Sequence, residues 1–170
     1  MTICLVGSEM CIRDRASRDD VQILRASCDA ILTGGNTLRN DNPRMNARVN
    51  FPINQPKKIL LTSKDCDKEL NFFKDNDVQI YKNKDLAQII KSFKDQDFCS
   101  ILIEAGPKLA NSFLELGLVD EIISYTSNYE LGDKAVSWFK ENNAIENYGF
   151  KLESTYKIDS DIKEVFKKNG

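Results

Sequence analysis

The residues best suited to chemistry lie in one stretch of this sequence, from Asp29 to Arg48. The stretch opens with the apolar run 30–32, which is typical of a buried strand. Two glycines follow, and then come side chains that carry hydroxyl, amide, carboxylate and guanidinium groups: Asn36, Thr37, Asn40, Asp41, Asn42, Arg44 and Arg48. Open α/β sheets bind ligands just beyond the carboxyl ends of their strands, so this stretch predicts a ligand site. An ordinary polar loop is the alternative, and local chemistry alone does not separate the two.

A second candidate site begins where the predicted strand 100–103 ends. Glu104 follows that strand, and Gly106 and Pro107 suit the N-cap and first position of a helix. The amino end of a helix presents free N–H groups, so it attracts anions. A plain strand-to-helix corner is the alternative.

Composition narrows the functional classes. The chain has 170 residues, enough for one domain with a real core, and 41% of them are hydrophobic. The net charge of −2 argues against a surface that coats nucleic acid, and no apolar run approaches the length of a membrane span. The absence of histidine excludes Ser-His-Asp hydrolysis, Cys-His proteolysis and the zinc deaminase signature. The five cysteines include no Cys-x-x-Cys pair, which predicts no metal site and buried, inert thiols in a reducing cytoplasm.

The hydrophobic pattern predicts alternating strands and helices. Ser17 is expected to cap a helix that leads into the strand 30–32, and Asp85 to cap a helix that ends near Lys94. Gly117 is expected to end the helix that begins at Pro107. Further strands are predicted at 59–61, 78–81, 100–103 and 120–125, with a closing antiparallel hairpin at 150–157 and 161–166.

Several motifs in order resemble the riboflavin-biosynthesis reductase family, which includes the carboxyl-terminal half of the bifunctional deaminase-reductase. The matching residues are Arg25-Ala26, Asp29 to Gly34, Thr37, Asp41-Asn42-Pro43, Arg48 and Glu104-Ala105-Gly106-Pro107. The resemblance implies a dihydrofolate-reductase-like three-layer α/β/α domain with a mostly parallel central sheet and a C-terminal antiparallel hairpin. It also implies NADPH-dependent reduction of the ribosyl group of 5-amino-6-(5-phosphoribosylamino)uracil to the ribityl product. A cytoplasmic homodimer is expected, with the deaminase domain absent from this chain.

The resemblance also assigns roles to individual residues. The expected cofactor-binding residues are Thr37, Asp41, Ser63, Gly106, Pro107, Lys108, Leu109, Ala110, Asn111 and Ser112. The expected substrate-binding residues are Arg25, Met45 (through its backbone), Arg48 and Glu104. The proton that the reduction requires is assigned to Asp41 or Glu104, and the sequence does not choose between them. The plain alternatives are a helix-surface charge for Arg25 and local caps for Thr37 and Asp41.

The first fifteen residues depart from the family pattern. The segment 4–15 resembles translated sequencing-adaptor read-through, so residues 1–15 are expected to be non-native or disordered. Residues 16–170 would then form a reductase domain without its usual first strand, which leaves the strand 30–32 without its usual neighbour. Two other readings remain: a dihydrofolate-reductase-like pterin reductase, and a truncated, non-catalytic remnant that binds nucleotide.

Overall fold

The structure is a computed structural model that describes residues 1–5, 15–74, 77–82, 85–126 and 145–168. The chain divides into two compact units. One unit is the continuous segment Gln22–Ile103, and the other combines Met1–Val21 with Glu104–Gly170. We call them the central unit and the terminal unit and describe each by itself. In the described part of the chain, no helix has the length and apolar character needed to cross a bilayer.

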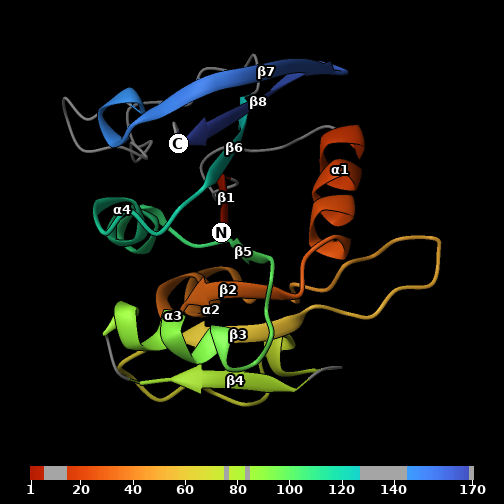
Figure 1. The fold of residues 1–170 in the computed structure, drawn as a ribbon. Coiled ribbons are helices and arrows are strands. Elements are labelled where there is room, and N and C mark those ends of the chain that lie inside the picture. Colours follow the sequence, from red (N-terminus) through yellow and green to blue (C-terminus); the bar gives the residue numbers. More distant parts are fainter. Residues whose placement is uncertain (6–14, 75–76, 83–84, 127–144, 169–170) are drawn as a thin grey trace. The chain divides into compact units, whose positions relative to one another are not determined.

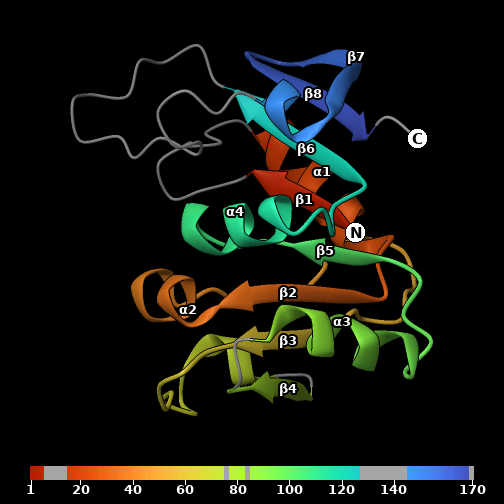
Figure 2. The ribbon, with the colours of Figure 1, turned by 60° about the vertical axis from the view of Figure 1, so that its left-hand side comes forward.

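The central unit is built on four parallel strands in the spatial order β4-β3-β2-β5, which lie side by side in Figure 2. They are β4 (Val78–Tyr81), β3 (Lys57–Leu61), β2 (Ala30–Gly34) and β5 (Ile101–Ile103). Every residue of β2 is buried, as expected for the near-continuous apolar run of an inner parallel strand. β2 pairs with β3 on one side and with β5 on the other. β2 is therefore paired on both sides, and the open edge expected from the loss of its usual neighbour is not found.

Three short helices belong to the central unit: α2 (Gly35–Asp41), η1 (Asn71–Phe73) and α3 (Leu86–Lys94). The predicted cap of α3 is confirmed, because the Asp85 carboxylate accepts a hydrogen bond from the Gln88 N–H. The apolar face of α3 packs on β4, where the rings of Phe93 and Tyr81 are 5.8 Å apart.

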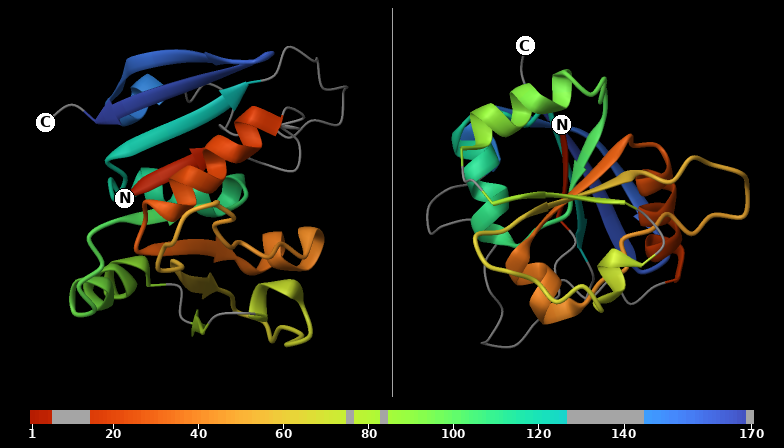
Figure 3. Two further views of the ribbon diagram at one scale, coloured as in Figure 1. Left: turned by 90° about the vertical axis from the view of Figure 1, so that its right-hand side faces the viewer. Right: turned by 90° about the horizontal axis from the view of Figure 1, so that it is seen from below.

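The terminal unit combines parallel and antiparallel pairing. β1 (Thr2–Leu5) runs parallel to β6 (Glu121–Thr126), and the two strands can be followed side by side in Figure 3. β6 pairs antiparallel with β8 (Asp161–Lys168), which forms a hairpin with β7 (Phe150–Ile158), drawn in blue in Figure 1. This hairpin confirms the predicted closing hairpin. The unit also holds η2 (Ile145–Tyr148) and α4 (Pro107–Glu115), which starts at Pro107 as predicted and is followed by Gly117 at a φ of 66°.

The amino-terminal region differs from its prediction. Thr2–Leu5 form a strand, because Ile3 and Cys4 are buried in register with Ile122 and Ile123 of β6. The disorder expected for residues 1–15 is therefore wrong for residues 2–5, while residues 6–14 lie outside the described part and the non-native origin of the segment stays a prediction. Helix α1 (Arg15–Ala26) begins two residues before Ser17, so Ser17 is a buried helical residue and not a cap.

Four of the cysteines lie in the described part, and they differ in exposure. Cys4 is buried as expected, Cys28 and Cys66 are half-buried, and Cys99 is exposed. The expectation of uniformly buried thiols is thus corrected.

Candidate functional site

The polar stretch that follows β2 begins as a helix and not as a loop. Thr37 lies half-buried in the first turn of α2, and Asp41 is its exposed last residue. Asn42 then takes a left-handed conformation with a φ of 42°, and its N–H donates to the Leu38 carbonyl. The helix therefore ends just before Pro43, and the two predicted cofactor ligands lie at its two ends.

Gly35 allows the start of α2 to lie directly against the end of β3. A Cβ atom at this position would be 2.5 Å from the Thr62 Oγ1 atom, a distance that real structures do not tolerate. Ser63, the next residue after Thr62, is exposed. Because β2 and β3 are paired through Gly34 and Leu61, the carboxyl ends of both strands bring Thr37 and Ser63 to the same edge of the central unit.

The two predicted substrate arginines are attached to one loop, residues 42–56. The Arg25 guanidinium, on the last turn of α1, donates from Nη1 to the Asn46 carbonyl at 3.3 Å. The backbone N–H of Arg48 donates to the buried Gln22 Oε1 atom at 3.0 Å. Since Gln22 lies one turn before Arg25, the same helix end is hydrogen-bonded to the loop at both Asn46 and Arg48.

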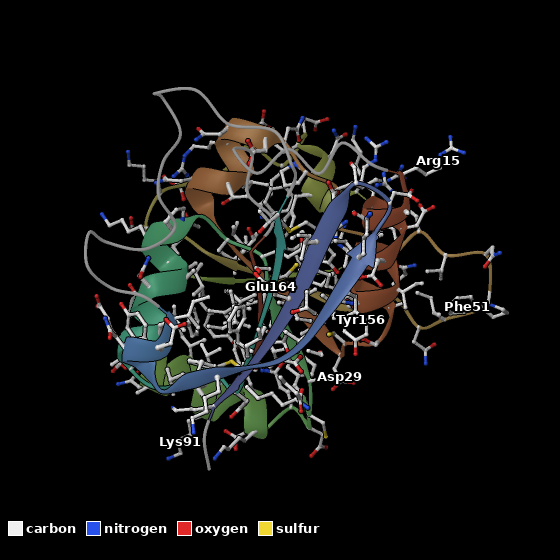
Figure 4. All side chains as sticks on the ribbon, turned by 90° about the horizontal axis from the view of Figure 1, so that it is seen from above. Arg15, Asp29, Phe51, Lys91, Tyr156 and Glu164 are labelled. Carbon is white, nitrogen blue, oxygen red and sulfur yellow. The ribbon has the colours of Figure 1, made fainter. Side chains whose placement is uncertain are left out.

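The side-chain amide of Gln55 connects two parts of the same loop. The Gln55 side chain accepts from the Ala47 N–H at 3.0 Å and donates to the Ala47 carbonyl at 2.8 Å. This double hydrogen bond pairs the side chain with one residue of backbone as a neighbouring strand would. Phe51, at the far tip of the loop, points away from the strands and is half exposed (Figure 4).

Met45 directly precedes the two anchored loop residues, Asn46 and Arg48, and takes a strained conformation. Its φ is 50°, a region that costs a non-glycine residue about 1–2 kcal/mol, and its side chain is buried. Strain of this kind collects at ligand-binding positions, where the surrounding structure holds the backbone in place. The buried side chain leaves the backbone as the group that a ligand would meet, which is the contact the sequence predicted.

The second predicted group lies in the terminal unit. Glu104 is buried, and Gly106 is the residue before the first turn of α4, with Pro107 at the first helical position. The Asn111 amide donates to the Pro107 carbonyl at 2.7 Å, and the Ser112 hydroxyl donates to the Lys108 carbonyl at 3.0 Å.

These two hydrogen bonds limit what α4 offers a ligand. The Asn111 and Ser112 side chains are turned back onto their own helix. The N–H groups of Leu109 and Ala110 are likewise used, since both donate to the Gly106 carbonyl. A phosphate bound here would therefore meet the first-turn backbone at Lys108 and the exposed Lys108 ammonium.

The predicted residues thus form two sets. One set is in the central unit and consists of Arg25, Thr37, Asp41, Met45, Arg48 and Ser63. The other is in the terminal unit and consists of Glu104 and Gly106 to Ser112.

One pocket of the central unit is lined by none of the residues in either set. It has a volume of about 480 Å³ and is lined by residues that include Ser27, Cys28, Asp29, Pro56 and Phe98. These residues lie at the amino ends of β2, β3 and β5. Because ligands of parallel sheets bind at the carboxyl ends, this pocket is not the predicted site.

Sequence reasoning missed a partly buried polar network in the terminal unit. The Tyr125 hydroxyl donates to the Asp20 carboxylate, and the Lys163 ammonium donates to the same oxygen at 2.7 Å. Burial raises the pKa of Tyr125 far above its ordinary value, and the nearby Cys4 thiol, Asp20 carboxylate and Glu104 carboxyl act in the same direction. The one available signal was a tyrosine at the carboxyl end of a predicted strand.

Comparison with known proteins shows which solved structures and which family this chain resembles. The fold is a mostly parallel α/β fold with a C-terminal antiparallel hairpin. The solved structure of RibD from Acinetobacter baumannii superposes with a TM-score of 0.83 at 26% identity, over 99% of this chain and 56% of that one. The yeast riboflavin biosynthesis reductase Rib7 (Saccharomyces cerevisiae) shares the fold, with a TM-score of 0.74 at 17% identity over 98% of this chain and 87% of that one.

A family model described as the RibD C-terminal domain matches residues 6–163, so the chain belongs to that family. The predicted riboflavin-biosynthesis reductase family is thereby confirmed. The riboflavin biosynthesis protein RibD of Buchnera aphidicola is 28% identical over 96% of this chain and 55% of its own length. RibD of Mycobacterium tuberculosis is 26% identical over 92% of this chain and 47% of its own length. The chain thus spans about half the length of these curated relatives.

Proposed function

We propose that this chain reduces the ribosyl group of 5-amino-6-(5-phosphoribosylamino)uracil to the ribityl product with NADPH. The observation that carries the proposal is the pair formed by Arg25, at the end of α1, and Arg48, on the loop 42–56 to which that helix end is hydrogen-bonded. The Arg25 side chain is hydrogen-bonded to the loop at Asn46, the Arg48 backbone is hydrogen-bonded to Gln22 of α1, and the strained backbone of Met45 directly precedes these two contacts. A planar guanidinium pairs with phosphate oxygens in a bidentate manner, which suits a sugar phosphate.

The cofactor-binding residues fit a phosphorylated dinucleotide. Thr37 and Asp41 lie at the ends of α2, and Ser63 lies beyond the neighbouring strand β3. The start of α4 has Gly106 and Pro107, which place no bulky or charged side chain in front of the helix, and Lys108 adds a positive charge. NADPH, when bound, supplies the hydride, and the chain's own residues bind and orient the reactants.

Of the two carboxyl groups proposed for proton transfer, we assign this role to Glu104. Glu104 is 5% exposed, whereas Asp41 is exposed at the end of α2. A general acid or base acts best where bulk water is excluded, because electrostatic interactions are stronger there. Asp41 is then left with the role of a cofactor ligand. The homodimer and the cytoplasmic location stay predictions.

The experiment is steady-state kinetics on the Arg25→Ala and Arg48→Ala variants. Loss of a charge-assisted hydrogen bond costs about 1.5–3 kcal/mol, so we expect the KM for the pyrimidine substrate to rise about ten- to a hundred-fold while the KM for NADPH stays nearly unchanged. Arg44→Ala, an exposed arginine on the same loop, is the matched control. An equal rise of both KM values would contradict the phosphate assignment.

Two outcomes would point to the other readings. Turnover of a dihydropterin in place of the phosphorylated substrate would favour a pterin reductase. Binding of NADPH without turnover of either substrate would favour a non-catalytic remnant.

A further inference from the structure

The loop 42–56 joins α2 to β3 without a helix or strand of its own, and the structure describes all of its residues. Loops of about this length that have no secondary structure are uncommon in compact domains and usually carry a function. Residues 46–48 of the loop contain two successive peptide groups, with two N–H donors and two carbonyl acceptors. The partners of these four groups decide how firmly this part of the loop is held.

The Gln55 side chain holds one edge of the segment 46–48. Its Oε1 atom accepts from the Ala47 N–H at 3.0 Å, and its Nε2 atom donates to the Ala47 carbonyl at 2.8 Å. A residue that exchanges both hydrogen bonds with one partner directs its own N–H and carbonyl to the same side, as in an antiparallel strand pair. Ala47 is therefore held in an extended conformation.

The end of α1 holds the opposite edge of the segment. The Asn46 carbonyl accepts from Arg25 Nη1 at 3.3 Å, and the Arg48 N–H donates to Gln22 Oε1 at 3.0 Å. In an extended segment, these two groups point away from the N–H and carbonyl of the residue between them. Gln22 is buried, so water competes little for its amide. All four backbone groups of the two peptide units are thus bonded to side chains.

This extended conformation determines the direction in which the Arg48 side chain leaves the backbone. Successive side chains of an extended segment point to opposite faces. Ala47 is 4% exposed and Arg48 is exposed, as this alternation requires. Because packing does little to hold an exposed side chain, the direction of Arg48 depends on the backbone at 46–48. A guanidinium that binds phosphate through two parallel hydrogen bonds is sensitive to this direction.

We propose that Gln22 and Gln55 are positioning residues for the substrate, because they hold the peptide groups on either side of Ala47 and so direct Arg48 towards the phosphate. The proposal rests on the phosphate-binding role of Arg48 in the proposed function. Neither glutamine is assigned a contact with substrate or cofactor, and both act through Arg48. The segment is then ordered before the substrate binds, which lowers the entropy cost of binding.

Removal of either amide should raise the KM for the pyrimidine substrate and leave the KM for NADPH nearly unchanged. Methionine is close in size to glutamine and lacks its amide, so Gln22→Met and Gln55→Met remove the contacts with little change in volume. The two hydrogen bonds of Gln55 correspond to a rise of up to about five- to a hundred-fold, and the single bond of Gln22 to a rise of up to about two- to ten-fold.

A double-mutant cycle separates positioning from a general structural effect. If the glutamines act through Arg48, Gln55→Met should hardly change the substrate KM once Arg48→Ala is present. Effects that multiply in the double variant would overturn the proposal. Asn54→Leu is the matched control, because Asn54 is an exposed amide next to Gln55 in the same loop, and it should change neither KM.

Hydrogen exchange adds a measurement that does not depend on turnover. The Ala47 amide should lose protection in Gln55→Met, and the Arg48 amide should lose it in Gln22→Met, since each amide then lacks its acceptor. Unchanged protection would overturn the proposal. The melting temperature of each variant shows whether any of these effects comes from unfolding.

The outcomes separate this proposal from the proposed function. In an active wild-type chain, an unchanged substrate KM in both variants, or equal rises of both KM values, would overturn the positioning role and leave the proposed function standing. A wild-type chain without turnover would overturn the proposed function. The affinity for ribose 5-phosphate would then decide the positioning role: weaker binding by the two variants than by the wild type would support it, and equal affinity or no binding at all would overturn it.

Discussion

Lys58 offers a sharp test of how the central unit holds its candidate cofactor residues. The side chain of Lys58 on β3 is fully buried, and its Nζ atom donates to the carbonyls of Phe72 and Lys74, each at 3.0 Å. These carbonyls belong to η1 and to the residue after it. The Asn71 N–H of η1 in turn donates to Asn42 Oδ1 at 2.8 Å. The ammonium is therefore connected, through η1, to the residue that ends α2.

We expect Lys58→Met to lower the free energy of unfolding by about 2–4 kcal/mol. Each carbonyl left without its donor costs about 1–3 kcal/mol, and removal of a desolvated ammonium recovers part of the sum. For a chain of this size, the melting temperature should fall by about 4–16 °C. Calorimetry or thermal circular dichroism measures this change.

The neighbouring lysine is the matched control. Lys57 lies on the same strand, is part exposed, and pairs with the exposed Asp77 at 3.7 Å. Such surface pairs contribute about 0–1 kcal/mol, so Lys57→Met should hardly change the melting temperature. Equal effects of the two substitutions, or a loss below about 1 kcal/mol for Lys58→Met, would refute the reasoning. Because Lys58→Met weakens the contacts that position Asn42, it should also reduce the affinity for NADPH. Fluorescence titration under conditions where the variant is folded measures this affinity.

Three further predictions follow from the central unit. Asp41→Ala should weaken NADPH binding in titration while the melting temperature stays unchanged, and equal affinity would count against its role as a cofactor ligand. Gly35→Ala should lower both the melting temperature and NADPH affinity, because its Cβ would force α2 away from Thr62; an unchanged protein would show that the contact is easily relieved. Hydrogen bonds from Ser100 hold the pKa of Asp29 below its ordinary value, so this carboxylate stabilises the fold at neutral pH and loses that effect as the pH falls through the acidic range. Asp29→Asn should therefore lower the melting temperature more at about pH 7 than at about pH 3, and a loss independent of pH would contradict this sign.

Local sequence signals predicted several helix ends that carry capping residues. Asp85 at the start of α3, Gly106 and Pro107 at the start of α4, and Gly117 after it all carry strong cap chemistry, and the structure places them as expected. Prediction failed at Ser17, which has cap chemistry but lies inside α1, and at α2, where such signals are weak. The Asn-rich α2 has low helix propensity, and it forms because its start packs on Thr62 and its end is held by Asn71.

The candidate site also contains some residues that could be predicted and others that could not. The family resemblance assigned roles to Arg25, Met45 and Arg48, which lie within residues 25–48. It did not name Gln22 or Gln55, which orient the loop, because an isolated glutamine has no pattern. It also gave no hint that Asp20, Tyr125 and Lys163 meet, since their contacts span 105 and 143 residues along the chain.

The pairing of β1 with β6 has a consequence for the order in which this chain is made. Thr2 contacts Glu121, a partner 119 residues later, whereas the central unit is one uninterrupted segment. At a synthesis rate of about 5–20 residues per second, β1 waits roughly 6–24 s for its partner strand. During that interval all strands of the central unit emerge and can pair with one another. Closing the long loop that joins β1 to β6 is then the slow, entropically costly step, so we expect the amino-terminal strand to gain protection on the ribosome later than the strands of the central unit.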